Sequence, residues 1–172
     1  NCNNIRIAKF DIEGNNVNSI YKGLGIDGYQ VGGRGVFLNA CKYASLDTLT
    51  IQRMTLDGVG INDTFCDTRT NIVMDSLVCL YSQRVGFDWS QGDSLIFRNC
   101  NFSQSGRATS LTQPPYQIGS GPGAGIDIEF EGSCTNPNNQ YLCKNGYFYN
   151  CDFVNNAGNG IVNDSPNNSD SV

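Results

Sequence analysis

A pattern of large apolar residues recurs five times along the chain, and it constrains the fold more than any other feature. Within each copy these residues stand at offsets 0, +2, +5 and +7, a spacing that fits two short strands joined by a corner and does not fit a helix. The first residues of the second, third and fourth copies lie 23 positions apart, twice in succession. Such a repeat predicts an all-β stack of similar coils. The copies are Ile5-Ile7-Phe10-Ile12, Leu49-Ile51-Met54-Leu56, Ile72-Met74-Leu77-Cys79, Leu95-Phe97-Cys100-Phe102 and Gly146-Phe148-Cys151-Phe153.

A glycine followed by an apolar residue stands downstream of each copy and predicts a third short strand. We therefore expect about five coils of three strands each, with parallel strands pairing along every face. A β-sandwich is the alternative, but its strands do not repeat at a fixed spacing with the same residue types in each column. The five glycine steps are Gly35-Val36, Gly60-Ile61, Gly86-Phe87, Gly125-Ile126 and Gly160-Ile161.

Composition removes several classes of function. The chain contains no histidine, which excludes Ser-His-Asp and Cys-His catalysis and every His-ligated zinc site. The formal net charge of −5 argues against a nucleic-acid partner. No apolar run approaches the length of about 20 residues that spans a bilayer, so no membrane partner is expected. The remaining chemistry depends on carboxylates, together with an Arg or a Lys.

The repeat, the Asn-rich turns and the phrase Gly125-Ile126-Asp127-Ile128-Glu129 resemble right-handed parallel β-helices of the pectate-lyase-like superfamily. Phage tailspikes that degrade bacterial surface polysaccharide are the members that the chain resembles most. The resemblance extends from about Ile5 to Asp164. It implies a right-handed coil, a homotrimer on an extracellular virion tail, and a polysaccharide bound along an exposed face. Because the first coil begins without a capping element, we expect a fragment of a longer solenoid.

The expected organisation is one β-helix domain, residues 1–164, followed by a polar tail, residues 165–172. Two long connections, 13–34 and 103–124, interrupt the first and fourth coils, and a polar insertion covers 133–145. Connections gathered on one face of a solenoid commonly mark its binding side, although a merely tolerated loop is an equal alternative. Tyr116 and Arg107 in the second connection and Tyr29 in the first are therefore candidate substrate-binding residues.

The glycine strands supply carboxylates. If the residue after each glycine points inward, the next one points outward, and this gives the column Phe37, Asn62, Asp88, Asp127, Val162. A second outward column then reads Asn39, Thr64, Ser90, Glu129, Asp164.

In this arrangement Asp127 and Glu129 lie about 6.6 Å apart, and Asp88 lies about 4.8 Å away on the adjacent coil. Carboxyl groups at such distances can divide into an acid and a base. We predict Asp127, Glu129 and Asp88 as catalytic, with Asn62 and Asp164 contacting substrate. A solvated acidic ladder and a calcium site are the alternatives.

Cysteines of the repeat are expected in the interior, mostly as free thiols. Disulfides between adjacent coils are the alternative, because a spacing of about 4.8 Å is within their Cα range. Cys79, Cys100 and Cys151 hold template positions, whereas Cys134 and Cys143 share the insertion and are the best candidates for a disulfide. No zinc site is expected, because the chain has no Cys-x-x-Cys and no histidine. Strand alternation also places Trp89 inward, beside Ile128.

Three functions are compatible with these residues. The first is a polysaccharide depolymerase that hydrolyses a glycosidic bond with paired carboxylates. The second is a lyase in which the acids hold Ca²⁺ and an Arg or Lys abstracts a proton. The third is a β-helix segment that binds glycan without cleaving it. Apart from this possible Ca²⁺, no cofactor is expected.

Overall fold

The computed structural model describes residues 2–15, 33–62, 70–107, 121–129 and 143–163. Within these ranges the chain forms strands and turns without a helix, and every strand pairing is parallel. The predicted all-β class with parallel strands is therefore confirmed. The described residues contain no helix that is long and apolar enough to cross a membrane.

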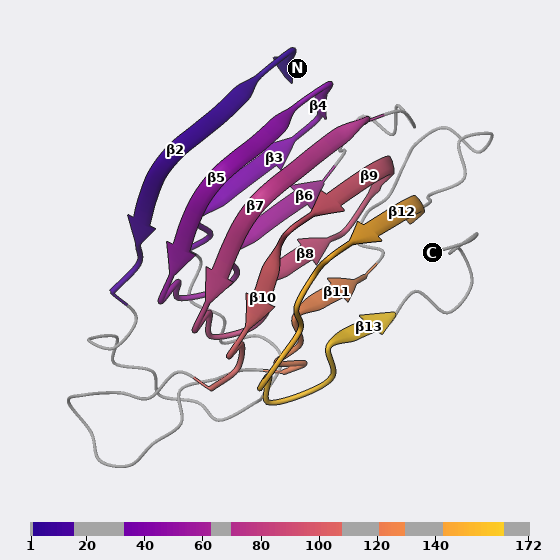
Figure 1. Ribbon diagram of the computed structural model, residues 1–172. Helices are drawn as coiled ribbons and strands as arrows, with labels where there is room; N and C mark the ends of the chain where they lie inside the picture. Colours follow the sequence, from indigo (N-terminus) through magenta and orange to yellow (C-terminus); the bar gives the residue numbers. More distant parts are fainter. Residues whose placement is uncertain (1, 16–32, 63–69, 108–120, 130–142, 164–172) are drawn as a thin grey trace.

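Two parallel sheets carry most of the strands, and the chain passes alternately from one to the other (Figure 1). The long-strand sheet has the order β12-β9-β7-β5-β2, and the short-strand sheet has the order β13-β11-β8-β6-β3. The long strands are β2 (Arg6–Glu13), β5 (Ser45–Gln52), β7 (Ile72–Leu80), β9 (Gly92–Arg98) and β12 (Cys143–Tyr149). The short strands are β3 (Val36–Asn39), β6 (Val59–Asn62), β8 (Phe87–Trp89), β11 (Ile126–Ile128) and β13 (Ile161–Asn163). In addition, β10 (Asn101–Ser103) pairs with β7, and β1 (Cys2–Asn3) pairs with β4 (Cys41–Lys42).

The register of the long strands confirms four copies of the apolar repeat and corrects the second. The second copy is Ala44-Leu46-Leu49-Ile51, because Leu49 pairs with Leu77 and Ile51 pairs with Cys79. The apolar spacing continues beyond the strand to Met54 and Leu56, so the same template also fits five residues downstream. The spacing of 23 therefore holds only between the copies that begin at Ile72 and Leu95.

The corner inside each copy is a residue in the left-handed backbone region, directly before offset +5. The five equivalent residues have φ between 52° and 65°. Asn suits this conformation best among them, and its side chain also links the coils. The Asn150 amide donates to Asn99 Oδ1 at 2.8 Å, and the Asn99 amide donates to Asp75 Oδ1 at 3.3 Å. The corner residues are Lys9, Thr48, Ser76, Asn99 and Asn150.

A column of glycines precedes the short strands and brings neighbouring coils close together. Val36 pairs with Val59, so the member from the second coil is Gly58, and the predicted member Gly60 is wrong. A Cβ on Gly58 would lie 2.5 Å from the Gly86 carbonyl oxygen and 2.9 Å from Cys79 Cβ, which leaves no room for any other residue. The column consists of Gly35, Gly58, Gly86, Gly125 and Gly160.

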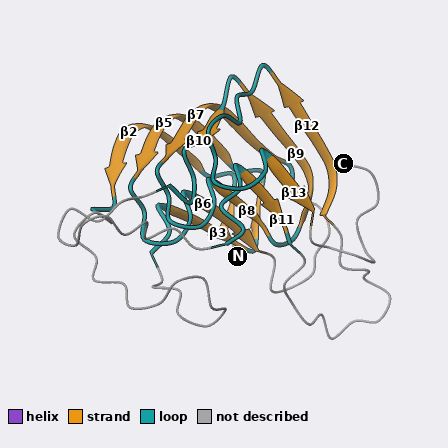
Figure 2. Ribbon diagram, turned by 90° about the horizontal axis from the view of Figure 1, so that it is seen from below, coloured by secondary structure: helices purple, strands orange, loops and turns teal. Residues whose placement is uncertain are grey.

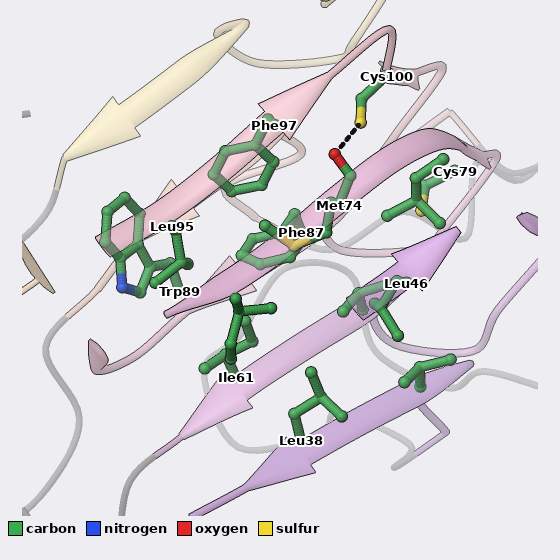
Figure 3. Packing of buried hydrophobic residues seen from close by; sticks show 14 of the residues in the cluster. Leu38, Leu46, Ile61, Met74, Cys79, Phe87, Trp89, Leu95, Phe97 and Cys100 are labelled. Atoms are coloured by element: carbon green, nitrogen blue, oxygen red, sulfur yellow. Dashed lines mark hydrogen bonds between the residues drawn. The ribbon is translucent and has the colours of Figure 1, made fainter. Parts of the chain in front are cut away.

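The two sheets face each other (Figure 2), and the hydrophobic core takes its buried side chains from both of them. Phe87, Phe97 and Phe102 are completely buried, and Phe87 meets Phe97 edge-on at 5.0 Å between ring centroids (Figure 3). Trp89 points inward and pairs with Ile128, as predicted. Such interlocking aromatic contacts fix the spacing of the coils.

The thiols of the repeat, Cys79, Cys100 and Cys151, are free, as predicted. Cys143 is also a free thiol, so the expected Cys134–Cys143 disulfide is wrong. Cys143 opens β12 and points into the core, where its thiol donates to the Trp89 carbonyl at 3.2 Å. Cys134 lies outside the described residues.

Candidate functional site

The predicted carboxylates come together on the short-strand sheet. Asp88 of β8 and Asp127 of β11 are in register on adjacent strands, as expected. Glu129 directly follows β11, and its backbone N–H donates to the Trp89 carbonyl at 3.2 Å. However, Asp88 and Asp127 are 0% and 1% exposed, so the expectation that both belong to an exposed column is wrong, and the alternative of a solvated acidic ladder is wrong for the same reason. Glu129 is more accessible, with 33% of its side chain exposed.

One buried arginine joins three of the carboxylates. The Arg84 guanidinium contacts Asp57 through Nε at 2.8 Å and through Nη2 at 3.1 Å, which is a bidentate pair. The same guanidinium contacts Asp88 at 2.9 Å and Glu129 at 3.2 Å. Because Arg84 is only 4% exposed, its charge-assisted hydrogen bonds to Asp57 and Glu129 and its ion pair with Asp88 lie in a region of low dielectric constant.

A second arginine, two residues before β3, contacts two of these three carboxylates. Arg34 contacts Asp57 at 2.9 Å and Asp88 at 2.8 Å, and its guanidinium lies 4.9 Å from the centre of the Phe37 ring. Its side chain passes over Gly60, where a Cβ would lie 2.7 Å from Arg34 Cδ. The missing side chain at Gly60 therefore gives Arg34 its path to Asp88. We call Arg34, Asp57, Arg84, Asp88 and Glu129 the arginine–carboxylate cluster.

Burial and charge act in opposite directions on this cluster. Burial raises the pKa of Asp57, and the neighbouring Arg84 and Arg34 oppose that rise. Burial lowers the pKa of Arg84, but its hydrogen bonds and ion pairs with the carboxylates outweigh burial and raise that pKa above its ordinary value. Arg84 is consequently held as a cation, and it cannot serve as a base near neutral pH.

The members of the cluster differ in what they offer to a ligand. Asp88 accepts hydrogen bonds from Arg34 on Oδ2 and from the Ser90 hydroxyl on Oδ1 at 2.9 Å, and its Oδ2 also forms an ion pair with Arg84. Its oxygens are thus engaged by the protein itself, and Asp88 positions the two arginines. Glu129 combines partial exposure with an arginine contact, which makes it the accessible carboxylate of the cluster.

Two of the predicted substrate-binding residues, Asn62 and Arg107, lie among the described residues. Asn62 pairs with Asn39 and belongs to the column of Ser90 and Glu129, two positions from its predicted place beside Asp88. The cause is the register at Gly58, which shifts the second coil by two residues. Arg107 donates to the Asn156 carbonyl at 3.3 Å, beyond β10. Tyr29, Tyr116 and Asp164 lie outside the described residues.

Sequence reasoning missed Arg34, Asp57 and Arg84. A signal for two of them exists, because Arg34 and Asp57 each directly precede a glycine of the column. Opposite charges at the same position of consecutive coils come into contact when the coils stack. Finding that signal requires the correct glycine in the second coil, which was misassigned.

A shallow groove of about 520 Å³ lies across β2, β5 and β7 of the long-strand sheet. Phe10 is 45% exposed there, and hydroxyls and opposite charges surround it. An exposed ring beside hydrogen-bonding groups is a surface that suits a sugar. The groove is lined by Lys9, Phe10, Asp11, Thr48, Leu49, Thr50, Ser76 and Val78.

Among the described residues, no group of three or more Cys, Asp or Glu side chains is arranged to hold a metal ion. Asp57, Asp88 and Glu129 contact arginines. No family model, curated protein or solved structure matches this chain.

Proposed function

We propose that the two sheets are faces of a right-handed parallel β-helix of about five three-strand coils. The regular passage of the chain between two parallel sheets supports this, because five strands of each sheet follow one another in stacked order. The glycine column supports it as well, since it gives every coil the same corner.

This β-helix, in our proposal, binds a bacterial surface polysaccharide and hydrolyses its glycosidic bonds. The observation that carries the proposal is the meeting of Asp88, Asp127 and Glu129 on adjacent strands, with Glu129 reaching solvent. Glycoside hydrolysis needs two carboxyl groups that differ in protonation. Glu129 and Asp127 are the reacting pair in this proposal, and Asp88 is a positioning residue that holds the arginines. A homotrimer on a virion tail is the assembly that the family resemblance suggests.

The charge on Arg84 favours hydrolysis over a lyase reaction at this cluster. A lyase needs a base that abstracts a sugar proton, and an arginine in that role must lose its charge. Both Arg34 and Arg84 contact two or more carboxylates, which stabilise the cationic form.

The test uses the full chain incubated with preparations of bacterial capsule and O-antigen. Hydrolysis shortens the glycan chains and yields plain reducing ends, whereas a lyase yields unsaturated ends that absorb in the ultraviolet. Glu129→Gln is expected to reduce the rate at least 100-fold, because the variant keeps the shape and loses the titratable group.

Glu13→Gln is the matched control. Glu13 is also partly exposed and also contacts one arginine, Arg53, at 2.9 Å, but it lies at the end of β2. Its rate should equal that of the unmodified chain. Unchanged cleavage by Glu129→Gln, or glycans that stay intact throughout the panel, would remove the hydrolase proposal.

The groove around Phe10 favours a second candidate, glycan binding without cleavage. Phe10→Ala should weaken retention of the chain on an immobilised glycan that the unmodified chain binds, and Glu129→Gln should leave it unchanged. Equal retention of the Phe10→Ala variant excludes the groove as the binding surface.

A further inference from the structure

Two cysteines of consecutive coils lie side by side at offset +5 of the repeat. The Asp152 N–H donates to the Cys100 carbonyl at 2.9 Å, and the Phe102 N–H donates to the Asp152 carbonyl at 2.9 Å. Asn101 and Asp152 form a parallel bridge, so Cys100 and Cys151 are in register directly before it. Adjacent strands at this register are separated by about 4.8 Å, which is within the Cα range of a disulfide.

The two thiols also point the same way. Each donates to the carbonyl two residues earlier, Cys100 to Arg98 at 3.1 Å and Cys151 to Tyr149 at 3.4 Å. Cys100 is buried beside Met74 (Figure 3), while Cys151 is partly exposed and packs against the edge of the core. One thiol of the pair is therefore within reach of solvent.

We propose that Cys100 and Cys151 are a redox-sensitive dithiol that closes to a disulfide on exchange with a low-molecular-weight disulfide such as oxidised glutathione. The inference does not depend on the proposed function. The disulfide joins the last described coil covalently to the preceding one, so this attachment depends on the redox state.

The exchange takes place in two balanced steps. The Cys151 thiolate attacks one sulfur of glutathione disulfide, forming a mixed disulfide and releasing one glutathione thiolate. The Cys100 thiolate then attacks Cys151 Sγ, forming the intramolecular bond and releasing the second glutathione. The two protein thiols lose two protons and two electrons, and one glutathione disulfide becomes two glutathione molecules.

Position in the fold separates this pair from the other described thiols. Cys79 is in register with Phe102 and is completely buried, so its Cα is offset by two residues from that of Cys100. Cys143 is buried and in register with Gly92. Cys2 and Cys41 are also in register, and the experiment therefore has to identify the linked peptides.

The second step should be the slower one. Burial raises the pKa of the Cys100 thiol to about 12, and Cys151 and Asp75 add to that rise. Cys79 is the further titratable group that interacts with Cys100. Because only the thiolate attacks, the closure rate should increase about tenfold per pH unit while the pH stays below that pKa.

The experiment incubates the native full chain with oxidised glutathione, quenches with acid, and maps tryptic peptides by mass spectrometry. Cys100 lies in peptide 99–107, Cys151 in 145–172 and Cys79 in 70–84, with one cysteine in each. We expect 99–107 linked to 145–172 with the loss of two hydrogen atoms, and 70–84 in the reduced form. A chain that stops at glutathionylated Cys151, or that reacts at neither residue, overturns the proposal.

Two further arms test the order of the steps and the role of geometry. Cys100→Ser should accumulate the mixed disulfide on Cys151, and Cys151→Ser should leave Cys100 reduced. Oxidation in concentrated urea should scramble the linkage among the cysteines, because the native register is lost. A native linkage pattern identical to the scrambled one contradicts the proposal.

Discussion

At the scale of single residues, Arg84 is the cation that compensates most of the buried negative charge. This side chain is 4% exposed and contacts Asp57 and Asp88, both completely buried, as well as Glu129. An ion pair at such depth gains little over an apolar pair of the same shape, because both charges lose their hydration. The situation changes when only one partner is removed, since the remaining charges are then buried without compensation.

Arg84→Met should therefore lower the free energy of unfolding by about 3–5 kcal/mol at neutral pH. Burial already raises the pKa of Asp57 and Arg84 opposes that rise, so in the variant the pKa of Asp57 rises further above its value in the unfolded chain. The folded variant then binds more protons than the unfolded chain, so its stability recovers as the pH falls. Urea unfolding at pH 7 and at about pH 4 measures both effects.

The matched control is Arg53→Met, which removes an exposed arginine from its pair with Glu13. We expect a change of less than about 1 kcal/mol, because water and salt screen exposed pairs. If both variants lose the same free energy of unfolding, or if the loss for Arg84→Met becomes larger at low pH, then Arg84 does not act by compensating the buried carboxylates.

The placement of Asp88 shows what strand alternation can and cannot predict for a single residue. Alternation correctly put Asp88 beside Asp127 and Trp89 in the core. It did not predict the burial of Asp88, because one of the covering side chains, Arg34, comes from 54 residues earlier in the chain. Contacts at that separation follow from the stacking of coils, which a local pattern does not contain.

At the scale of elements, the glycine column sets how closely neighbouring coils approach. At each member, a Cβ would overlap with atoms of the neighbouring strands or turns, and four members face the carbonyl oxygen of the next glycine. Gly58 is tightly enclosed by rigid groups, with the Gly86 carbonyl oxygen at 2.5 Å and Cys79 Cβ at 2.9 Å from where its Cβ would lie.

Gly58→Ala should lower the free energy of unfolding by about 1–3 kcal/mol, because the methyl group has to push two paired backbones apart. Urea denaturation followed by the fluorescence of Trp89 measures the loss. Gly121→Ala is the control, since a Cβ there meets nothing within 4 Å. Equal stability of Gly58→Ala and the unmodified chain would show that the coils are not held at this spacing.

The misassigned second coil shows why register was the least predictable property of the elements. Apolar residues at Leu49, Ile51, Met54 and Leu56 fit the template as well as Ala44, Leu46, Leu49 and Ile51 do. The spacing repeats after five residues, so one stretch of sequence fits two registers. Only the pairing of Leu49 with Leu77 distinguishes them, and that is a property of the sheet.

At the scale of the whole molecule, the sequence predicted the fold class, but it predicted only some residues of the candidate site. The parallel all-β arrangement follows from a repeat that every coil carries, so an error in one coil leaves the class unchanged. The candidate site has no such redundancy. Arg34, Asp57 and Arg84 each occur once, in connections whose positions depend on the register of the second coil.

The order of the parallel strands also implies that stability varies across each sheet. Leu77 of β7 is 0% exposed, whereas Phe10 of β2, in the same column, is 45% exposed. The short-strand sheet repeats the contrast, with Ile126 at 0% and Ile161 at 39%. A residue in a central coil has neighbours on both sides, and a residue in an outer described coil has them on one side.

Amide hydrogen exchange should therefore be slowest in β7 and β9 and fastest in β2 and β13. Because each coil contacts only its neighbours, opening of an outer coil exposes one interface, while opening of β7 breaks the pairings with β5 and β9 together. Exchange measured by mass spectrometry on peptides that cover β7 (Ile72–Leu80) and β9 (Gly92–Arg98) can be compared with that of peptides near each end of the stack. Equal protection in β2, β7 and β13 would mean that the coils unfold as one cooperative unit. In that case the free-energy losses predicted for Arg84→Met and Gly58→Ala should appear as a uniform increase of exchange, whereas nearest-neighbour coupling confines the increase to the coils around β6 and β8.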